Sequence, residues 1–337
     1  MMLIGVIVYG LGLLGISIAS NLVMFYIGFI FLGLGTSLAI AMVPQTMLAR
    51  WFKNNLGKAA AVVSMGGAIG GLFVPVVVKM IDAYGWQNSF LILALVMWLI
   101  GIPLYFVFRA KPEQHGLLTD DKTKNNVKGL HHSQNSGPGV SVREALKMRA
   151  FWQIGLSYML QLGSIHAVTI HVMPYLASLG VERSTASMVA MLIPLVSFTA
   201  RIPFGWLADT FRKTYVMGVS VSLTIAGLLL FWLIDGSSAK LIYLFVIVFG
   251  LGMAGPGPVR TPIVREYFGT KNFGTIFGLI KVFSMIGLLV YPPLAGWVYD
   301  TFNSYKIIWL IYGVGCLVGA ILMVTAPLPK KEVEVLR

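Results

Sequence analysis

Residues 214–234 read TYVMGVSVSLTIAGLLLFWLI, and this stretch contains no charged side chain. A helix that crosses a membrane needs roughly 20 consecutive, mostly apolar residues. Of the 337 residues in the chain, 57% are apolar and 11% are charged. An ordinary soluble domain carries about 25% charged residues. A water-soluble fold of this length could not bury so much apolar surface. The composition therefore excludes a soluble enzyme, a disordered chain and a coiled coil.

Further stretches of the same kind occur along the whole chain. We predict an all-α membrane protein with ten visible transmembrane helices, at residues 2–20, 22–48, 58–80, 87–108, 152–178, 185–206, 214–234, 240–263, 273–298 and 305–326.

The positions of the basic residues indicate how the chain crosses the membrane. Most of the 25 Lys and Arg residues fall in alternate connecting segments and therefore on one side. Positive charge stays on the cytoplasmic side, so we expect both termini in the cytoplasm and the protein in the inner or plasma membrane. The net charge of +13 is then a topology signal, and we expect a monomer in a lipid bilayer with no nucleic-acid partner.

One long polar segment, residues 109–150, interrupts the apolar stretches. We predict an N-terminal bundle over residues 1–108, a flexible cytoplasmic linker over 109–150, a C-terminal six-helix bundle over 151–327 and a cytoplasmic tail over 328–337. A single cysteine, Cys316, excludes a disulfide framework and any metal site built from cysteines. We expect no metal and no cofactor.

The two halves resemble each other in sequence. Phe52 and Phe268 each follow a basic residue at the start of a connecting segment, and Asp82 and Asp300 end the following stretch at nearly the same offset. Such a repeat is typical of secondary transporters. With that offset, the counterpart of Asp209 would lie before Met1. We therefore expect two further helices at the N-terminal end, twelve in all, and a truncated gene or fragment.

Residues 205–213, Gly-Trp-Leu-Ala-Asp-Thr-Phe-Arg-Lys, lie between two apolar stretches. This segment resembles the loop motif G-x-L-x-D-x-x-x-R-K of the major facilitator superfamily. Finer features resemble the bacterial relatives of monocarboxylate and oxalate–formate transporters, namely residues 50–52, 85–86, 112–118, 151–152, 171–176 and 266–269. The resemblance implies a fold of two helical bundles.

The loop motif implies a gate formed by Gly205, Asp209, Arg212 and Lys213. Asp209 can accept hydrogen bonds from the positive end of a neighbouring helix or from Arg212. Breaking that contact would let the bundles rock.

Lys281 is the clearest candidate for a binding residue. It lies about 15 Å along a helix from Lys271, which places it near the middle of the bilayer. A lysine there costs about 2.5–3.5 kcal/mol on insertion scales. All twelve acidic residues fall outside the middle of the predicted spans. Lys281 therefore faces water, has a shifted pKa or meets an anion supplied by the substrate.

Arg201 is the second candidate, about 12 Å along a helix from Asp209. A guanidinium group binds a carboxylate through two parallel hydrogen bonds, and the resemblance implies that an arginine at this place contacts substrate. Alternatively, Arg201 reaches the interface or braces the loop motif. His171 and Tyr175 lie in the shared His-x-x-Pro segment, and we add them and Gln161 to the expected substrate-binding residues. His171 could relay protons or bond to a neighbouring helix.

These features predict a secondary active transporter of a small organic anion, a monocarboxylate or a dicarboxylate, and not an enzyme. Two bundles would rock around a cationic central site. Proton symport and anion exchange are both compatible with the sequence. One alternative is efflux of a drug-like or neutral solute, with Lys281 merely solvated. Another is a truncated remnant or membrane sensor that transports nothing.

Overall fold

A computed structural model describes residues 2–52, 55–107, 139–236 and 238–327. Within these ranges the chain forms helices and one isolated β-bridge, between Gly139 and Gly269. The helices are α1 (Met2–Ser17), α2 (Leu22–Gly35), the π-helix η1 (Thr36–Met42), α3 (Val43–Trp51), α4 (Leu56–Leu72), α5 (Val74–Val107), α6 (Val142–Lys147), α7 (Arg149–Ser178), α8 (Arg183–Thr210), α9 (Lys213–Leu233), α10 (Ala239–Ala254), α11 (Pro256–Phe268), α12 (Phe273–Phe302) and α13 (Lys306–Val324).

The chain divides into two compact units. The N-terminal unit comprises Met1–Asn54 and Gly66–Asn126, and the C-terminal unit comprises Asn55–Met65 and Val127–Arg337. Helix α4 thus begins in the C-terminal unit and continues into the N-terminal one. The first turns of α4 belong to the C-terminal unit because Gly57 and Lys58 bond to Asp209 of α8.

In the N-terminal unit, α1 packs against both α2 and α5. Helix α5 contains a break at Gly85, where the backbone has φ 76° and ψ 160°. Such a positive φ is easily reached by glycine because it lacks a Cβ atom. The break at Gly85 lies between the predicted stretches 58–80 and 87–108. The sequence therefore predicts the position of this break, although the residues before and after it are both helical.

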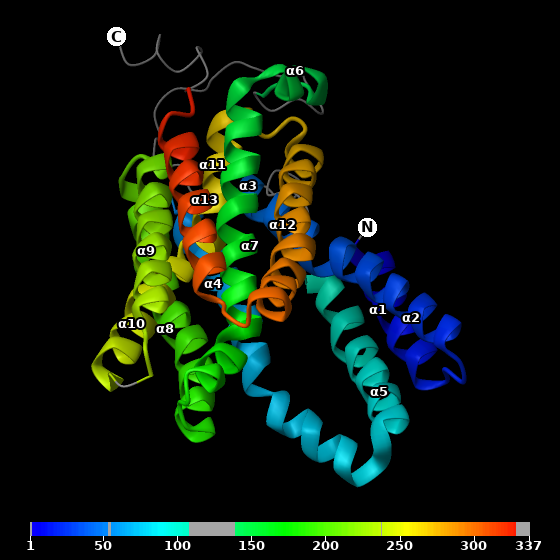
Figure 1. Ribbon diagram of the computed structural model, residues 1–337. Coiled ribbons are helices and arrows are strands. Elements are labelled where there is room, and N and C mark those ends of the chain that lie inside the picture. The colour runs from blue at the N-terminus through cyan, green and yellow to red at the C-terminus, as the bar shows by residue number, and fades with distance from the viewer. Residues whose placement is uncertain (1, 53–54, 108–138, 237, 328–337) are drawn as a thin grey trace, which may run out of the picture. The chain divides into compact units, whose positions relative to one another are not determined.

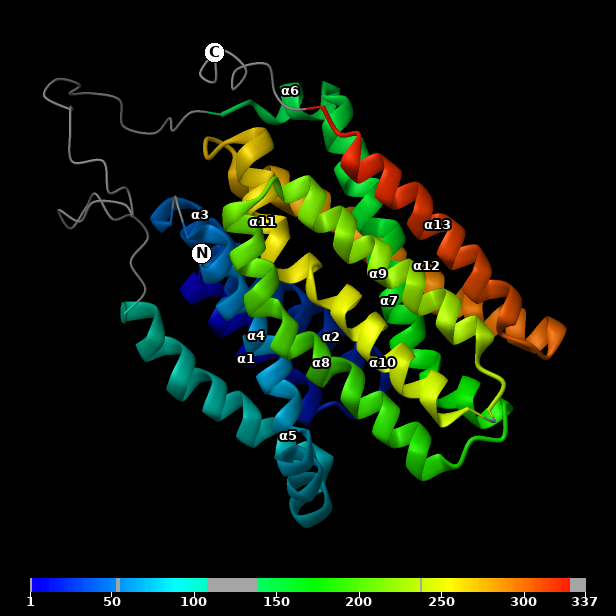
Figure 2. The same cartoon turned by 90° about the vertical axis from the view of Figure 1, so that its left-hand side faces the viewer.

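In the C-terminal unit, α7 packs against α12 and α13, and these two helices lie on either side of it in Figure 1. Helix α9 packs against α10 and α13, and α8 packs against α10 and α11. Helices α10 and α11 follow one another along one line, as Figure 2 shows.

Among the described residues, seven helical segments are long and apolar enough to cross a membrane: Leu22–Ala49, Lys79–Phe106, Arg183–Thr210, Lys213–Leu233, Ala239–Phe268, Phe273–Phe302 and Lys306–Val324. The predicted number of ten is therefore not confirmed. Met2–Ser17 and Leu56–Gly66 are apolar but shorter. Helix α7 is 30 residues long and carries Gln153, Gln161, His166 and His171, and it is not among these seven segments.

The predicted linker and tail fall largely outside the described residues, which exclude 108–138 and 328–337. The end of the linker forms α6. Its first turn has a capping box, in which the Ser141 N–H donates to Glu144 Oε2 (2.7 Å) and the Glu144 N–H donates to Ser141 Oγ (3.2 Å). This reciprocal pair satisfies two amide groups that a helix leaves without partners. A linker predicted to be flexible thus ends in an ordered turn of helix.

A proline separates α10 from α11 and explains a buried polar contact. Pro256 has no N–H, so it cannot donate to the Gly252 carbonyl one turn earlier. That carbonyl instead accepts from Ser220 Oγ (2.7 Å) and Gln161 Nε2 (3.3 Å). Gln161 also donates to Thr224 Oγ1 (3.1 Å). The fully buried Gln161 therefore joins α7 to α9 and α10 at the proline.

Tyr175 serves the end of a helix in a similar way. Its hydroxyl donates to the carbonyl of Phe231 (2.9 Å), in the last turn of α9. The last four carbonyls of a helix have no partner within it. The Tyr175 ring packs edge-on against Phe231 and Trp309, at 4.5 and 5.7 Å between centroids. Tyr175 is 1% exposed, so its hydroxyl and its ring both join α7 to its neighbours.

Replacing Tyr175 with Phe should lower the free energy of unfolding by about 1 kcal/mol, because the ring remains while a buried carbonyl loses its donor. Thermal unfolding in detergent would measure the change. Tyr243→Phe is the matched control, since Tyr243 is 44% exposed and its hydroxyl reaches Met188 Sδ only at 4.0 Å. Equal melting temperatures for the two variants would contradict the assigned role of the Tyr175 hydroxyl.

Candidate functional site

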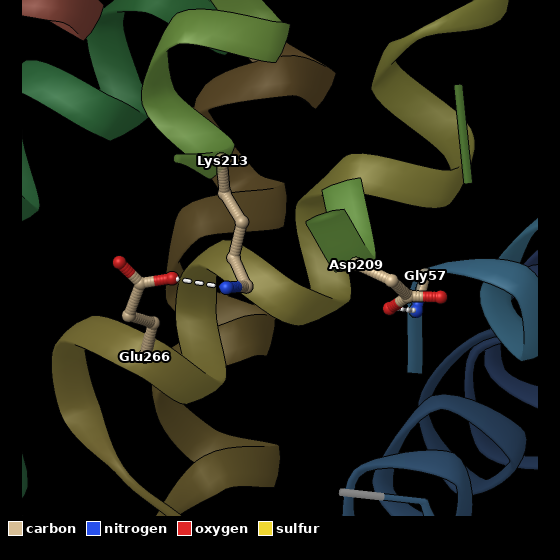
Figure 3. Close-up of polar contacts among 4 residues, drawn as sticks. All are labelled: Gly57, Asp209, Lys213 and Glu266. Carbon is tan, nitrogen blue, oxygen red and sulfur yellow. Dashed lines mark hydrogen bonds and ion pairs between the residues drawn. The ribbon is translucent and has the colours of Figure 1, made fainter. Parts of the chain in front are cut away.

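The loop motif lies where α8 ends and α9 begins. Asp209, in the last turn of α8, accepts hydrogen bonds from two backbone amides of α4. Its Oδ1 lies 2.6 Å from the Gly57 nitrogen and its Oδ2 lies 2.9 Å from the Lys58 nitrogen; Figure 3 shows the first of these contacts. The first amides of a helix have no partner within it and carry positive partial charge. The carboxylate therefore caps α4, which is the first of the two contacts that the sequence left open.

Two glycines allow α8 and α4 to approach closely enough for this cap. A Cβ atom on Gly205 would lie 2.6 Å from the carbonyl oxygen of Gly57 and 2.8 Å from Cβ of Ala61. A Cβ atom on Gly57 would in turn meet the Gly205 carbonyl and Asp209 Oδ1. The requirement for glycine at the start of the loop motif is thus steric, because any side chain would separate the two backbones.

The two basic residues of the motif have different partners. Lys213 Nζ lies 2.6 Å from Glu266 Oε2, which joins the start of α9 to α11 (Figure 3). Arg212 donates from Nη1 to the Tyr215 hydroxyl (3.2 Å), and its Cζ lies 4.9 Å from the centroid of that ring. Arg212 thus pairs with Tyr215 and leaves Asp209 to the helix terminus.

Arg201 lies on α8 and its side chain reaches α4. Nη1 of Arg201 donates to the backbone carbonyl of Ser64, while Nε is shielded from solvent and has no hydrogen-bond partner. The Ser64 carbonyl is a neutral acceptor, so the positive charge of the guanidinium group is not balanced by this contact. Arg201 therefore braces α4 and retains donors for an anion.

Lys281 lies on α12 and is partly exposed. Among the described residues it makes no hydrogen bond and no ion pair. The charge that acts on it comes from Arg260 and has the same sign. The structure thus leaves Lys281 without a protein counter-ion.

Arg260 was not among the predicted binding residues, because the predicted stretch 240–263 ends three residues after it and so placed it beside the following connecting segment. The structure places it inside α11, with its Cζ 4.5 Å from the centroid of the Tyr158 ring. It lies about 12 Å along the helix from Phe268, where α11 ends. The same measure of helix depth that selected Arg201 would have selected Arg260 if α11 had been expected to extend to Phe268.

His171 is held between two helices. Its Nε2 lies 3.0 Å from the carbonyl oxygen of Pro292, and its Nδ1 lies 3.2 Å from the Tyr305 hydroxyl. A carbonyl only accepts, so these contacts assign the proton to Nε2 and make Nδ1 the acceptor. Burial, with Tyr299 and Asp300 nearby, raises the pKa of Tyr305, so its hydroxyl stays protonated and can donate.

The predicted binding residues do not form one cluster in this structure. His171 and Tyr175 both pack against the Tyr305 ring, with centroids 5.4 and 5.8 Å away. In the part of the chain that the structure describes, no hydrogen bond or ion pair joins Arg201, Lys281 and His171 to one another. Gln161 and Tyr175 donate to backbone carbonyls. Their role in binding substrate stays a prediction.

Known proteins of similar sequence identify the family of this chain. The sequence profile described as Major Facilitator Superfamily matches residues 1–180 and 163–336. The chain belongs to the Major Facilitator Superfamily. It is therefore a multi-pass integral membrane transporter and not an enzyme.

Relatives in this superfamily include the sialic acid transporter NanX of Escherichia coli, which is 28% identical over 88% of this chain and 70% of its own length. Monocarboxylate transporter 12 of Xenopus laevis is 22% identical over 95% of this chain and 72% of its own length.

Solved structures with the same fold include the proton:xylose symporter XylE, with a TM-score of 0.73 and 16% identity over 99% of this chain and 82% of that one. The human organic anion transporter MFSD10 has a TM-score of 0.72 and 13% identity over 96% of this chain and 76% of that one. At these identities the likeness shows the fold alone.

Gly57→Ala should destabilise the contact between α4 and α8, at a cost of about 1–3 kcal/mol for overpacking. Thermal unfolding in detergent would measure the loss. Hydrogen exchange at the Gly57 and Lys58 amides should also become faster, since the cap by Asp209 lengthens. Gly66→Ala on the same helix is the control, because a Cβ atom there meets nothing within 4 Å. Equal melting temperatures for both variants would contradict the steric argument.

Proposed function

We propose that this protein is a secondary active transporter of a small organic anion, a monocarboxylate or a dicarboxylate. It would work as a monomer in the inner or plasma membrane, with both termini in the cytoplasm. The observation that carries the proposal is Lys281, an amine within a membrane-spanning helix that has no protein counter-ion among the described residues. An unpaired lysine at this depth costs about 2.5–3.5 kcal/mol. An anionic substrate would supply the missing charge.

Two acidic residues that lie near the ends of spans support this reading, because they are already engaged. Asp209 caps α4 and Glu266 pairs with Lys213. Neither carboxylate is therefore available to Lys281. The relatives support it as well, since one is named a sialic acid transporter and others monocarboxylate transporters.

Arg201 and Lys281 are the residues that we propose bind the substrate carboxylate. A guanidinium group offers a planar fork of donors that matches a carboxylate, and Arg201 uses one of its nitrogens on the Ser64 carbonyl. We retain Gln161, His171 and Tyr175 as further substrate-binding residues. Each of them would exchange a hydrogen bond within the protein for one to the substrate.

The coupling is either proton symport or anion exchange. His171 supports a proton step, because its Nδ1 accepts the hydrogen bond from Tyr305 and is therefore the ring nitrogen that can gain a proton. A proton on Nδ1 would make it a donor, so the hydrogen bond with the Tyr305 hydroxyl would reverse, while Nε2 would keep its bond to the Pro292 carbonyl on α12. Uptake driven by an inward proton gradient, compared with uptake driven by internal anion, separates the two modes.

We further propose that the loop motif is a gate, composed of Gly205, Asp209, Arg212 and Lys213. The cap on α4 joins a carboxylate to two amides of a helix that continues into the other unit. During alternating access, this cap would form in one state and break in the other. The ion pair between Lys213 and Glu266 would keep the motif fixed to α11 throughout.

Lys281→Gln and Arg201→Gln should each lower uptake at least about tenfold, as expected for losing one charge-assisted contact with an anion. The measurement is uptake of labelled lactate and labelled succinate by proteoliposomes that contain equal amounts of folded protein. Lys240→Gln is the matched control, because Lys240 is exposed at the start of α10. Unchanged uptake in both site variants would refute the assignment of these residues.

Asp209→Asn should lower the maximal rate of uptake severalfold while KM changes little, because the residue caps a helix and does not touch substrate. An asparagine keeps one acceptor but loses the charge that the helix terminus favours. Asp82→Asn, at an exposed position of α5, is the control. A change confined to KM would contradict a gating role and indicate direct contact with substrate.

A further inference from the structure

Four side chains from three helices of the C-terminal unit form a second polar group, which we call the Arg260 cluster. Its members are Arg260 on α11, Lys281 on α12, and Tyr158 and His166 on α7. Arg260 links the others, because its guanidinium group lies over the Tyr158 ring and its charge acts on both Lys281 and His166.

The guanidinium group of Arg260 has unused donors. Its Nε is shielded from solvent and has no hydrogen-bond partner. Among the described residues, the group makes no hydrogen bond to a carboxylate or a carbonyl. Its described neighbour is the π-face of Tyr158, 4.5 Å from Cζ. Stacking of this kind orients the plane of the group and leaves its edge free for an acceptor.

The remaining members of the cluster also offer donors. Tyr158 is fully buried, and its hydroxyl makes no hydrogen bond within the usual geometric limits. Lys281 offers an ammonium group without a partner. Ser284, one turn from Lys281 on α12, has a buried hydroxyl that is likewise without a partner. A buried site that presents donors and positive charge is complementary to an anion with several acceptor oxygens.

The charge of the cluster indicates how many negative charges the ligand carries. Arg260 and Lys281 repel each other, and in a medium of low polarity this repulsion is larger than in water. One carboxylate would neutralise one of the two cations and leave the other bare. A ligand with two carboxylates would neutralise both.

We propose that Arg260, with Lys281 and Tyr158, forms an anion-binding subsite that makes the transporter prefer a small dicarboxylate over a monocarboxylate. This inference rests on the proposed function, of which it specifies the substrate class. Arg260 binds one carboxylate through its free edge, the Tyr158 ring fixes the orientation of the guanidinium plane, and Lys281 meets the second negative charge.

The test is equilibrium binding of labelled succinate and labelled lactate to the purified protein in detergent. The unmodified protein should bind succinate at least about tenfold more tightly than lactate. Arg260→Gln should weaken succinate binding roughly ten- to a hundredfold, as expected for one charge-assisted contact, and change lactate binding less than about threefold. Arg183→Gln, which removes the same charge at the exposed start of α8, should change neither affinity.

Arg260→Lys is a second variant that keeps the buried charge, and it keeps the test decisive if Arg260→Gln does not fold. It should remain folded by thermal unfolding and still lose part of the succinate preference, since an ammonium group lacks the planar fork. A succinate preference that survives both substitutions overturns the inference. Equal weakening of succinate and lactate also overturns it, because it indicates one shared carboxylate site.

The two proposals fail in different ways. If the unmodified protein binds neither acid, the proposed transport of organic anions fails and the subsite fails with it. If it binds both acids equally, or with a preference that does not depend on Arg260, only the dicarboxylate subsite fails.

Discussion

Inside a membrane, a polar group that loses its protein partner finds no water to replace it. This constraint accounts for most polar contacts of the C-terminal unit. The Gly252 carbonyl, which Pro256 leaves without a donor, is bonded by Ser220 and Gln161. The Phe231 carbonyl at the end of α9 is bonded by Tyr175. The sequence predicts that Gln161 and Tyr175 bind substrate. In the structure they donate to backbone carbonyls that a proline or a helix end leaves without a donor.

Charged groups near the ends of the spans, such as Asp209 and Lys213, also have partners within the protein. The carboxylate of Asp209 meets two free amides of α4, and Lys213 meets Glu266. These contacts connect α4, α8, α9 and α11 at the loop motif. They need little space, since Gly57 and Gly205 bring two backbones into direct contact. The motif therefore combines a steric requirement with an electrostatic one.

Arg260 and Lys281, like Arg201, break this rule within the described part of the C-terminal unit, because no carboxylate there balances their charge. Both lie in membrane-spanning helices, and neither meets an acidic side chain there. Two positive charges near each other repel, and this repulsion lowers the stability of the empty protein. The same repulsion raises the affinity for an anion, because a bound anion offsets it. A transporter benefits from such an arrangement, because binding of the substrate removes an unfavourable charge and so stabilises the loaded state.

The sequence by itself determined the membrane environment, the superfamily and the loop motif. Each depends on composition or on residues adjacent in the chain, as in Gly205–Lys213 and in the apolar run that follows it. The position of Lys281 inside a long apolar helix was also predictable, because it depends only on the run of apolar residues around it. The number of spans was not, since two of the ten predicted stretches form short helices (Met2–Ser17 and Leu56–Gly66) and α7 carries polar side chains, of which Gln153 and Gln161 are buried.

Only the tertiary structure decided the partners. The cap of α4 by Asp209, the bond of Arg201 to the Ser64 carbonyl and the stacking of Arg260 on Tyr158 join residues about 100 or more positions apart. Hydropathy describes the surroundings of a residue averaged over a helix and contains no information on which helix lies beside it. Arg260 was not selected for this reason: the predicted stretch 240–263 ends three residues beyond it, whereas α11 packs against α8, α9 and α12 and continues to Phe268.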